Sequence, residues 1–145
     1  MSTNKIRRKV DPNLSLKAIS AKTEIQKEVF KSEKNAVLHG SAGTGKTFIT
    51  SHIAYKAVLE RKEYEKVIYI RSAVPTRNLG FLPGTEQEKV QVYEQPYREI
   101  AAELFDRGDA YELLKASDAV KFTTTSNIRG ITLRNCIVIV DECQN

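Results

Sequence analysis

Residues 40–47 constrain the fold of this chain more than any other segment. They are Gly40, Ser41, Ala42, Gly43, Thr44, Gly45, Lys46 and Thr47, and they fit the pattern G-x-x-x-x-G-K-[S/T]. A short apolar run at 35–39 precedes this pattern, and apolar residues at helical spacing follow it over 46–60. We therefore expect a strand, a glycine-rich turn and a helix in that order, which is the context that a phosphate-binding loop requires.

The residue types in this pattern suit the binding of a nucleotide triphosphate. Glycines at 40, 43 and 45 allow backbone N–H groups to turn inward around a phosphate, and the start of the helix adds a partial positive charge. We expect Lys46 to reach the outer phosphates and Thr47 to place its hydroxyl on Mg²⁺. A glycine-rich turn that binds nothing is the weaker reading, because chance rarely produces the whole pattern in this context.

A second segment, near the other end of the chain, completes such a site. The apolar run Cys136–Val140 predicts a buried parallel strand covered on both sides, and Asp141 and Glu142 follow it directly. Ligands of open α/β sheets gather at the carboxyl ends of the strands, so Asp141 is expected to hold Mg²⁺ there. Glu142 is expected to orient or deprotonate an attacking water.

Two glutamines each have two open interpretations. Gln144 could sense the γ-phosphate, or it could be a polar residue in a turn. Gln26 could recognise adenine through its amide group, or it could form a capping box with Thr23 at the start of a helix.

The rest of the chain predicts an α/β fold with a parallel sheet and flanking helices, because strands and helices alternate along it. We expect further strands at 67–70 and 120–124, and helices at 23–31, from about Pro96 to Gly108, and after an N-cap at Asp109. A loop is expected at about 73–85.

Charge and composition limit the classes of protein that remain. The net charge is +5, but residues 1–9 contain four basic residues and no acid, which leaves 5 − 4 = +1 for the remainder. We expect a flexible basic arm at 1–20 and one domain over 21–145. The longest apolar run falls short of the roughly 18 residues of a membrane-spanning helix, and no secretory signal is indicated. A cytoplasmic protein with reduced cysteines and no membrane partner is therefore expected.

Taken together, these motifs resemble the PhoH-like ATPases, relatives of superfamily-one helicases found in bacteria and phages. The similarity covers about residues 23–145 and rests on GSAGTGKT, RSAVPTRNLGFLPGTEQEKV, YEQPY, IRGITLRN and IVIVDECQN. It implies a P-loop NTPase fold that binds ATP and Mg²⁺ and hydrolyses ATP. It also implies RNA or single-stranded nucleic acid as a partner, and leaves a homo-oligomer of the full-length protein open.

The resemblance also assigns residues. Gly40–Thr47 match the Walker A loop, and Asp141 and Glu142 match the Walker B motif. Gln144 matches the helicase-like position after Walker B, and Gln26 matches an upstream glutamine that binds adenine in helicase relatives. Lys46, Glu142 and Gln144 are thereby the expected catalytic residues. Arg71 and the loop up to Gly84 match a second family block that could bind a nucleic-acid strand or merely pack; Ser72 stands where the family commonly has proline.

Family members continue well past the acidic motif, so the resemblance implies a chain truncated after Walker B and a sheet without its C-terminal strands. One such strand lies between the loop-bearing strand and the Asp141 strand. We therefore expect either a gap of roughly 10 Å between these two strands or their direct pairing. Nucleotide binding without turnover is the alternative function. A kinase is less favoured, because Glu142 beside the metal-binding acid suits the activation of water.

Overall fold

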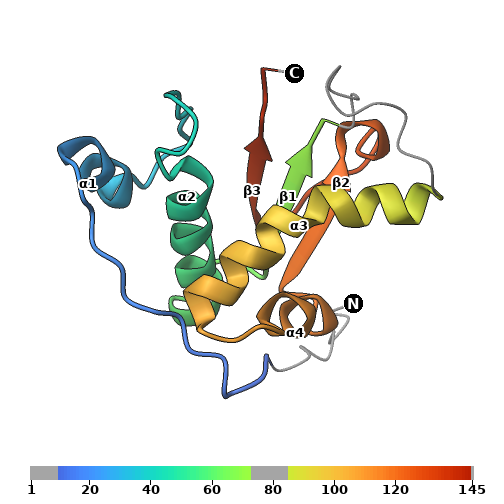
Figure 1. Ribbon diagram of the computed structural model, residues 1–145, viewed down its shortest axis with the longest axis horizontal. Coiled ribbons are helices and arrows are strands. Elements are labelled where there is room, and N and C mark those ends of the chain that lie inside the picture. The colour runs from blue at the N-terminus through green and yellow to red at the C-terminus, as the bar shows by residue number, and fades with distance from the viewer. Residues whose placement is uncertain (1–9, 73–84, 145) are drawn as a thin grey trace, which may run out of the picture.

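The computed structural model describes residues 10–72 and 85–144 (Figure 1). Residues 73–84 lie outside the described residues, and with them most of the loop predicted at 73–85. The elements are, in order, α1 (Glu24–Lys31), α2 (Lys46–Tyr55), a π-helical turn η1 (Lys56–Glu60), β1 (Lys66–Arg71), α3 (Glu86–Phe105), α4 (Ala110–Ala116), β2 (Val120–Thr124), a 3₁₀ turn η2 (Thr125–Asn127) and β3 (Cys136–Asp141).

The three strands form a parallel sheet in the order β2-β1-β3. The register aligns Arg71 of β1 with Asp141 of β3 and with Thr124 of β2, so all three strands end at one edge (Figure 1). The predicted α/β class with a parallel sheet and flanking helices is confirmed. Carboxyl ends that share one edge are the place where ligands of such sheets bind.

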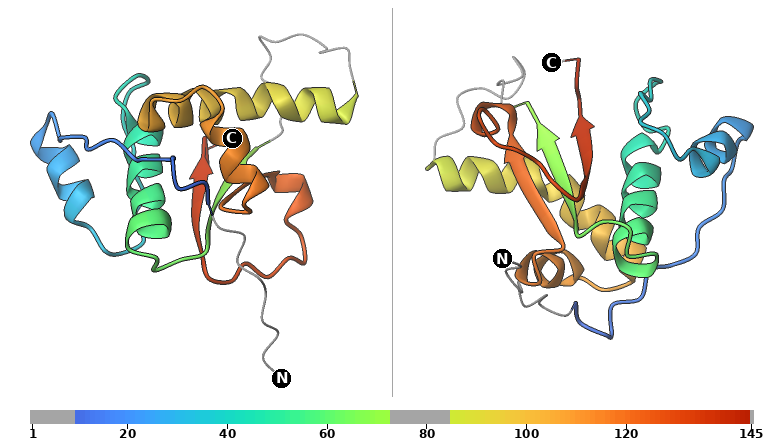
Figure 2. Two further views of the ribbon diagram at one scale, coloured as in Figure 1. Left: turned by 90° about the horizontal axis from the view of Figure 1, so that it is seen from below. Right: turned by 180° about the vertical axis from the view of Figure 1, so that it is seen from behind.

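One face of the sheet carries the core, which α2, α3 and α4 complete. Val67, Tyr69 and Val120 of the sheet are buried there against Tyr97, Leu104 and Leu114 of the helices. Figure 2 shows the opposite face from behind, with the helices on the far side of the strands. On β3, Val138 and Val140 remain 38% and 51% exposed. The expected cover on both sides of this strand is therefore wrong within the described residues.

The expected strand at 35–39 is not formed. These residues adopt neither helix nor strand, and the side chain of Val37 is 83% exposed. An extended segment forms a ladder only beside another strand, and β3 pairs with β1 alone among the described residues. We expected this segment either to lie one missing strand away from the Asp141 strand or to pair with it directly. Neither arrangement is present, because residues 35–39 do not form a strand.

Helix α3 begins ten residues before the predicted start at Pro96. Its true start is a capping box in which the Thr85 hydroxyl accepts from the Glu88 N–H while the Glu88 carboxylate accepts from the Thr85 N–H. Pro96 lies inside the helix, and the carbonyl that loses its partner belongs to the exposed Val92, where water can replace the bond. The helix ends at Phe105 before a left-handed Asp106, so the predicted stop at Gly108 is also wrong.

Residues 10–20 have no regular structure but are attached to the core. Leu14, Leu16 and Ile19 are partly buried against it, and the Lys17 N–H donates to the Leu104 carbonyl at 2.8 Å. The expected division into an arm at 1–20 and a domain at 21–145 stays a prediction, and residues 1–9 lie outside the described residues. Across the described ranges, we find no helix with the length and apolar character needed to traverse a bilayer.

Candidate functional site

The glycine-rich loop closes around the ammonium group of Lys46. Lys46 Nζ donates to the Gly40 carbonyl at 2.9 Å and to the Ser41 carbonyl at 2.8 Å. Gly45, the N-cap of α2, has a φ of +83°, a left-handed conformation that glycine adopts without strain. The loop stands at the amino end of α2, on the side of the molecule toward which β1 and β3 point (Figure 1). The amino end of α2 thus lies at the carboxyl edge of the sheet, and the Lys46 ammonium group binds the carbonyls of its own loop.

The two predicted metal ligands touch each other. The Thr47 hydroxyl donates to Asp141 Oδ1 at 3.1 Å, although the residues are 94 positions apart in the sequence. The Glu142 N–H also reaches Oδ1, at 3.2 Å. This contact joins the first turn of α2 to the end of β3. It places a hydroxyl and a carboxylate side by side beside the glycine-rich loop.

A tyrosine to which the sequence analysis gave no role in the site completes the surroundings of Asp141. The Tyr97 hydroxyl, from α3, donates to Asp141 Oδ2 at 2.9 Å, and its residue is fully buried. Burial, followed by the negative charge of Asp141, raises the pKa of Tyr97 well above its ordinary value. The phenol therefore keeps its proton and acts as a donor. The sequence signal was its place in the segment YEQPY, which carries part of the family resemblance but was given no role in the site.

Behind this residue, a group of buried tyrosines connects three elements. The ring of Tyr69 on β1 stacks on that of Tyr97 with centroids 4.2 Å apart. The Tyr69 hydroxyl donates to Ser51 Oγ of α2 at 2.8 Å, one helical turn after Thr47. Burial raises the pKa of Tyr69 to about 12. Strand β1 is thus fixed to α2 and α3 next to the tyrosine that binds Asp141.

The remaining predicted site residues lie farther from this centre. Glu142 and Gln144 follow β3, are exposed, and bond to each other through Gln144 Nε2 and Glu142 Oε2. Glu142 has a φ of +51°, an uncommon conformation for this residue type. Gln26 lies on α1, and its side-chain oxygen accepts from the Lys22 N–H at 2.6 Å. The structure does not bring Gln26 into hydrogen-bond contact with the glycine-rich loop.

Arg71 ends β1 beside the site, in register with Asp141. Its guanidinium carbon lies 5.7 Å from the ring centroid of Tyr93 on α3. The rest of the family block that we associated with Arg71, residues 73–84, lies outside the described residues.

The donors present fit a small, hard cation. Mg²⁺ is usually held by one or two carboxylates together with waters and substrate phosphates, and Thr47 and Asp141 supply oxygen donors of that kind. Within residues 10–72 and 85–144, no cluster of three or more His, Cys, Asp or Glu could hold a metal by itself. The arrangement therefore suits a metal bound together with a phosphate, not a closed cage of protein ligands.

Comparison with known proteins identifies the family of this chain. Residues 18–145 match the family described as PhoH-like protein. A PhoH-like protein of Synechocystis sp. is 36% identical over 131 residues, which cover 88% of this chain and 39% of the relative. A PhoH-like protein of Bacillus subtilis is 34% identical over 140 residues, 94% of this chain and 43% of the relative. Protein PhoH2 of Thermobispora bispora is 34% identical over 117 residues, which cover 73% of this chain and 24% of the relative.

The chain spans less than half the length of these relatives. The match nevertheless extends over both the glycine-rich loop and the acidic end of β3. This chain belongs to the PhoH-like protein family, whose members are generally P-loop NTPases.

Proposed function

We propose that this chain binds ATP with Mg²⁺ and hydrolyses it. The contact between Thr47 and Asp141, 3.1 Å apart beside the Lys46 loop, is the observation that carries the proposal. Thr47 and Asp141 would hold the cation, which supplies charge neutralisation on the phosphates when it is bound. Lys46, freed from the carbonyls of its own loop, would bind the outer phosphates.

Glu142 is proposed to orient or deprotonate the attacking water, and Gln144 to sense the γ-phosphate. Their mutual hydrogen bond supports a shared role next to Asp141. Gln26 is proposed to reach adenine from α1, which packs against α2 through the rings of Phe30 and His52. This last role requires Gln26 to exchange its bond with the Lys22 N–H for one with the base.

Coupling to RNA or single-stranded nucleic acid is part of the proposal. An arginine held near an aromatic ring at the rim of the site, as with Arg71 and Tyr93, is the kind of surface on which unpaired bases stack. A cytoplasmic location and a homo-oligomer of the full-length protein remain predictions.

The alternative is nucleotide binding without turnover. Phosphoryl transfer depends on accurate positioning, and the segment before the glycine-rich loop is not held in the sheet. Imperfect positioning of the loop would lower the rate more than the affinity.

The test combines calorimetry of ATP binding with an assay of phosphate release, with and without single-stranded RNA. Lys46→Ala should lose at least about ten-fold in ATP affinity, because it removes the cation in the loop. Lys56→Ala, an exposed lysine just after α2, is the matched control and should bind normally. Phosphate release that depends on Lys46 supports hydrolysis, and binding without release supports the alternative. The absence of any binding by the wild-type chain refutes both.

A further inference from the structure

The two oxygens of Asp141 have different partners. Oδ1 accepts the hydroxyl of Thr47 at 3.1 Å and the Glu142 N–H at 3.2 Å, while Oδ2 accepts the hydroxyl of Tyr97 at 2.9 Å. Only the Oδ1 side adjoins the glycine-rich loop through Thr47. The carboxylate is therefore presented to the loop by Oδ1, while Oδ2 is bound to a buried hydroxyl on the side of α3.

Tyr97 has little freedom to release Oδ2. Its ring is fully buried, stacks on Tyr69 and lies 5.7 Å from the ring of Phe122. Rotation of the ring away from Asp141 would open a cavity among these aromatic side chains. The hydroxyl thus stays on Oδ2 as long as α3 keeps its position.

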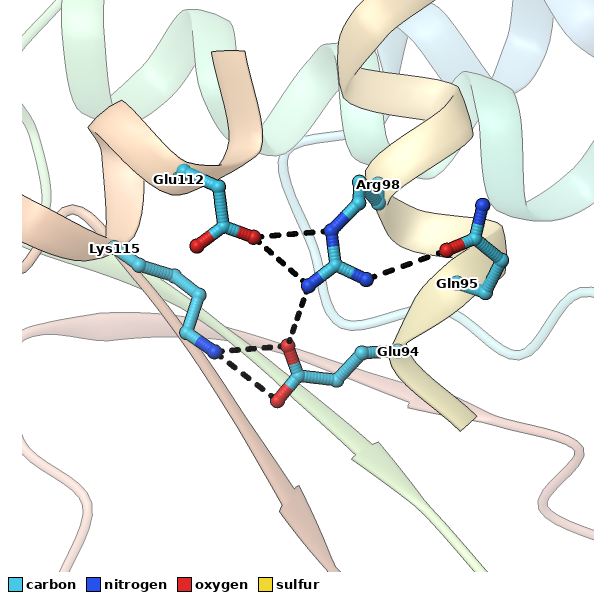
Figure 3. Close-up of polar contacts among 5 residues, drawn as sticks. All are labelled: Glu94, Gln95, Arg98, Glu112 and Lys115. Atoms are coloured by element: carbon cyan, nitrogen blue, oxygen red, sulfur yellow. Dashed lines mark hydrogen bonds and ion pairs between the residues drawn. The ribbon is translucent and has the colours of Figure 1, made fainter. Parts of the chain in front are cut away.

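Glu94 and Arg98, which come before and after Tyr97 in the sequence, belong to a polar cluster between α3 and α4 (Figure 3). Glu94, whose side chain is only 7% exposed, accepts from Lys115 Nζ of α4 at 2.9 Å. Arg98, one residue after Tyr97, donates to Glu112 of α4 at 2.8 Å. The segment of α3 that presents Tyr97 is therefore attached to a second helix.

One-oxygen ligation matters for the identity of the cation. Mg²⁺ requires a nearly octahedral shell at short distances, whereas Ca²⁺ accepts six to eight ligands and readily takes both oxygens of a carboxylate. A hydrogen-bond donor that occupies Oδ2 disfavours two-oxygen binding, and so disfavours the larger ion.

We propose that Tyr97 is a positioning residue that holds Asp141 as a one-oxygen ligand and thereby gives the site a preference for Mg²⁺ over Ca²⁺. This inference rests on the proposed function, because it concerns the same nucleotide site. It adds a determinant of metal selectivity supplied by α3.

The test measures binding of a fluorescent ATP analogue to the 145-residue chain in EDTA, in Mg²⁺ and in Ca²⁺. In the wild type, Mg²⁺ should strengthen binding more than Ca²⁺ does. Tyr97→Phe should lose about ten-fold of the Mg²⁺ enhancement, the lower end of the effect of removing a partner of a metal ligand. Its enhancement by Ca²⁺ should rise relative to its enhancement by Mg²⁺, because Oδ2 is then free to bind the larger ion, and its affinity in EDTA should be unchanged.

Tyr111→Phe is the matched control. Tyr111 is also fully buried, but its hydroxyl has no hydrogen-bond partner within the described residues. This variant should keep the wild-type ratio of Mg²⁺ to Ca²⁺ enhancement. In an Asp141→Asn background, Tyr97→Phe should have no further effect on that ratio, because Tyr97 acts through Asp141.

The outcomes separate the two proposals. An unchanged ratio in Tyr97→Phe, while the wild type shows Mg²⁺-enhanced binding, overturns the role of Tyr97 and leaves the proposed function intact. If Tyr97→Phe does not fold, the wild-type measurement tests the proposal. Equal enhancement of nucleotide binding by Mg²⁺ and Ca²⁺ would contradict ligation through a single oxygen of Asp141. A wild type that binds no nucleotide under any condition refutes the proposed function and this inference with it.

Discussion

At the residue scale, Gly45 joins the glycine-rich loop to α2 in a conformation that other residues avoid. A Cβ added there would meet Ile49 Cδ1 at 3.9 Å, an ordinary contact, so the cost of a side chain comes from the φ of +83°. Gly45→Ala should lower the free energy of unfolding by about 1–2 kcal/mol, measured by urea denaturation. Gly108→Ala is the control, since Gly108 is exposed with nothing within 4 Å of the added Cβ. Equal losses in the two variants would contradict this explanation.

The contacts of individual residues show which parts of the candidate site could be predicted from the sequence. Thr47 and Asp141 could be paired in advance, because a phosphate loop and an acid at the end of a parallel strand imply one edge of one sheet. Tyr97 could not, because its spacing from Ala101 and Leu104 is that of an ordinary core stripe. Its partner is 44 residues away in the sequence, and no local pattern announces that contact. The roles assigned to Glu142, Gln144 and Gln26 stay predictions.

At the scale of elements, the contact between α3 and α4 depends on the buried carboxylate of Glu94. Lys115→Met should destabilise the fold by about 1–2 kcal/mol, because a mostly buried charge loses its closest partner while Arg98 remains 3.9 Å away. The control is Lys121→Met, which breaks an exposed pair with Asp118 at 3.4 Å and should cost less than about 0.5 kcal/mol. Thermal unfolding of both variants measures the difference. Indistinguishable values would mean that the cluster contributes no more than surface charge.

Some of the helices and strands could be predicted from local sequence, and others could not. Strands β1, β2 and β3 were predicted within about one residue, because β1 and β3 are short apolar runs and β2 alternates apolar and polar side chains, and both patterns are sufficient signals. The start of α3 was missed although Thr85 and Glu88 form a capping box, because Pro96 suited a first helical position equally well. The strand expected at 35–39 failed for a non-local reason: its apolar composition cannot supply a neighbouring strand.

At the scale of the whole molecule, one tyrosine-rich core holds the sheet and its helices together. Four of the six tyrosines, namely Tyr55, Tyr69, Tyr97 and Tyr111, are fully buried, and they come from α2, β1, α3 and α4. Burial raises the pKa of each of these phenols. The phenolate form is therefore excluded from the folded state over a pH range in which it forms freely in the unfolded chain.

This difference predicts unfolding at alkaline pH. Below the unfolded tyrosine pKa of about 10 both states keep the phenol proton, and the contribution of the buried tyrosines is complete. As the pH rises toward the folded pKa of Tyr69, about 12, the unfolded chain releases protons that the folded chain retains, and stability falls. Tyr69 alone accounts for about 3 kcal/mol of this loss. Tyrosinate absorbance and circular dichroism should be followed together, without interference because the chain has no tryptophan. The four buried tyrosines should ionise only as the helical signal disappears, whereas their ionisation with an unchanged helical signal would disprove the common core.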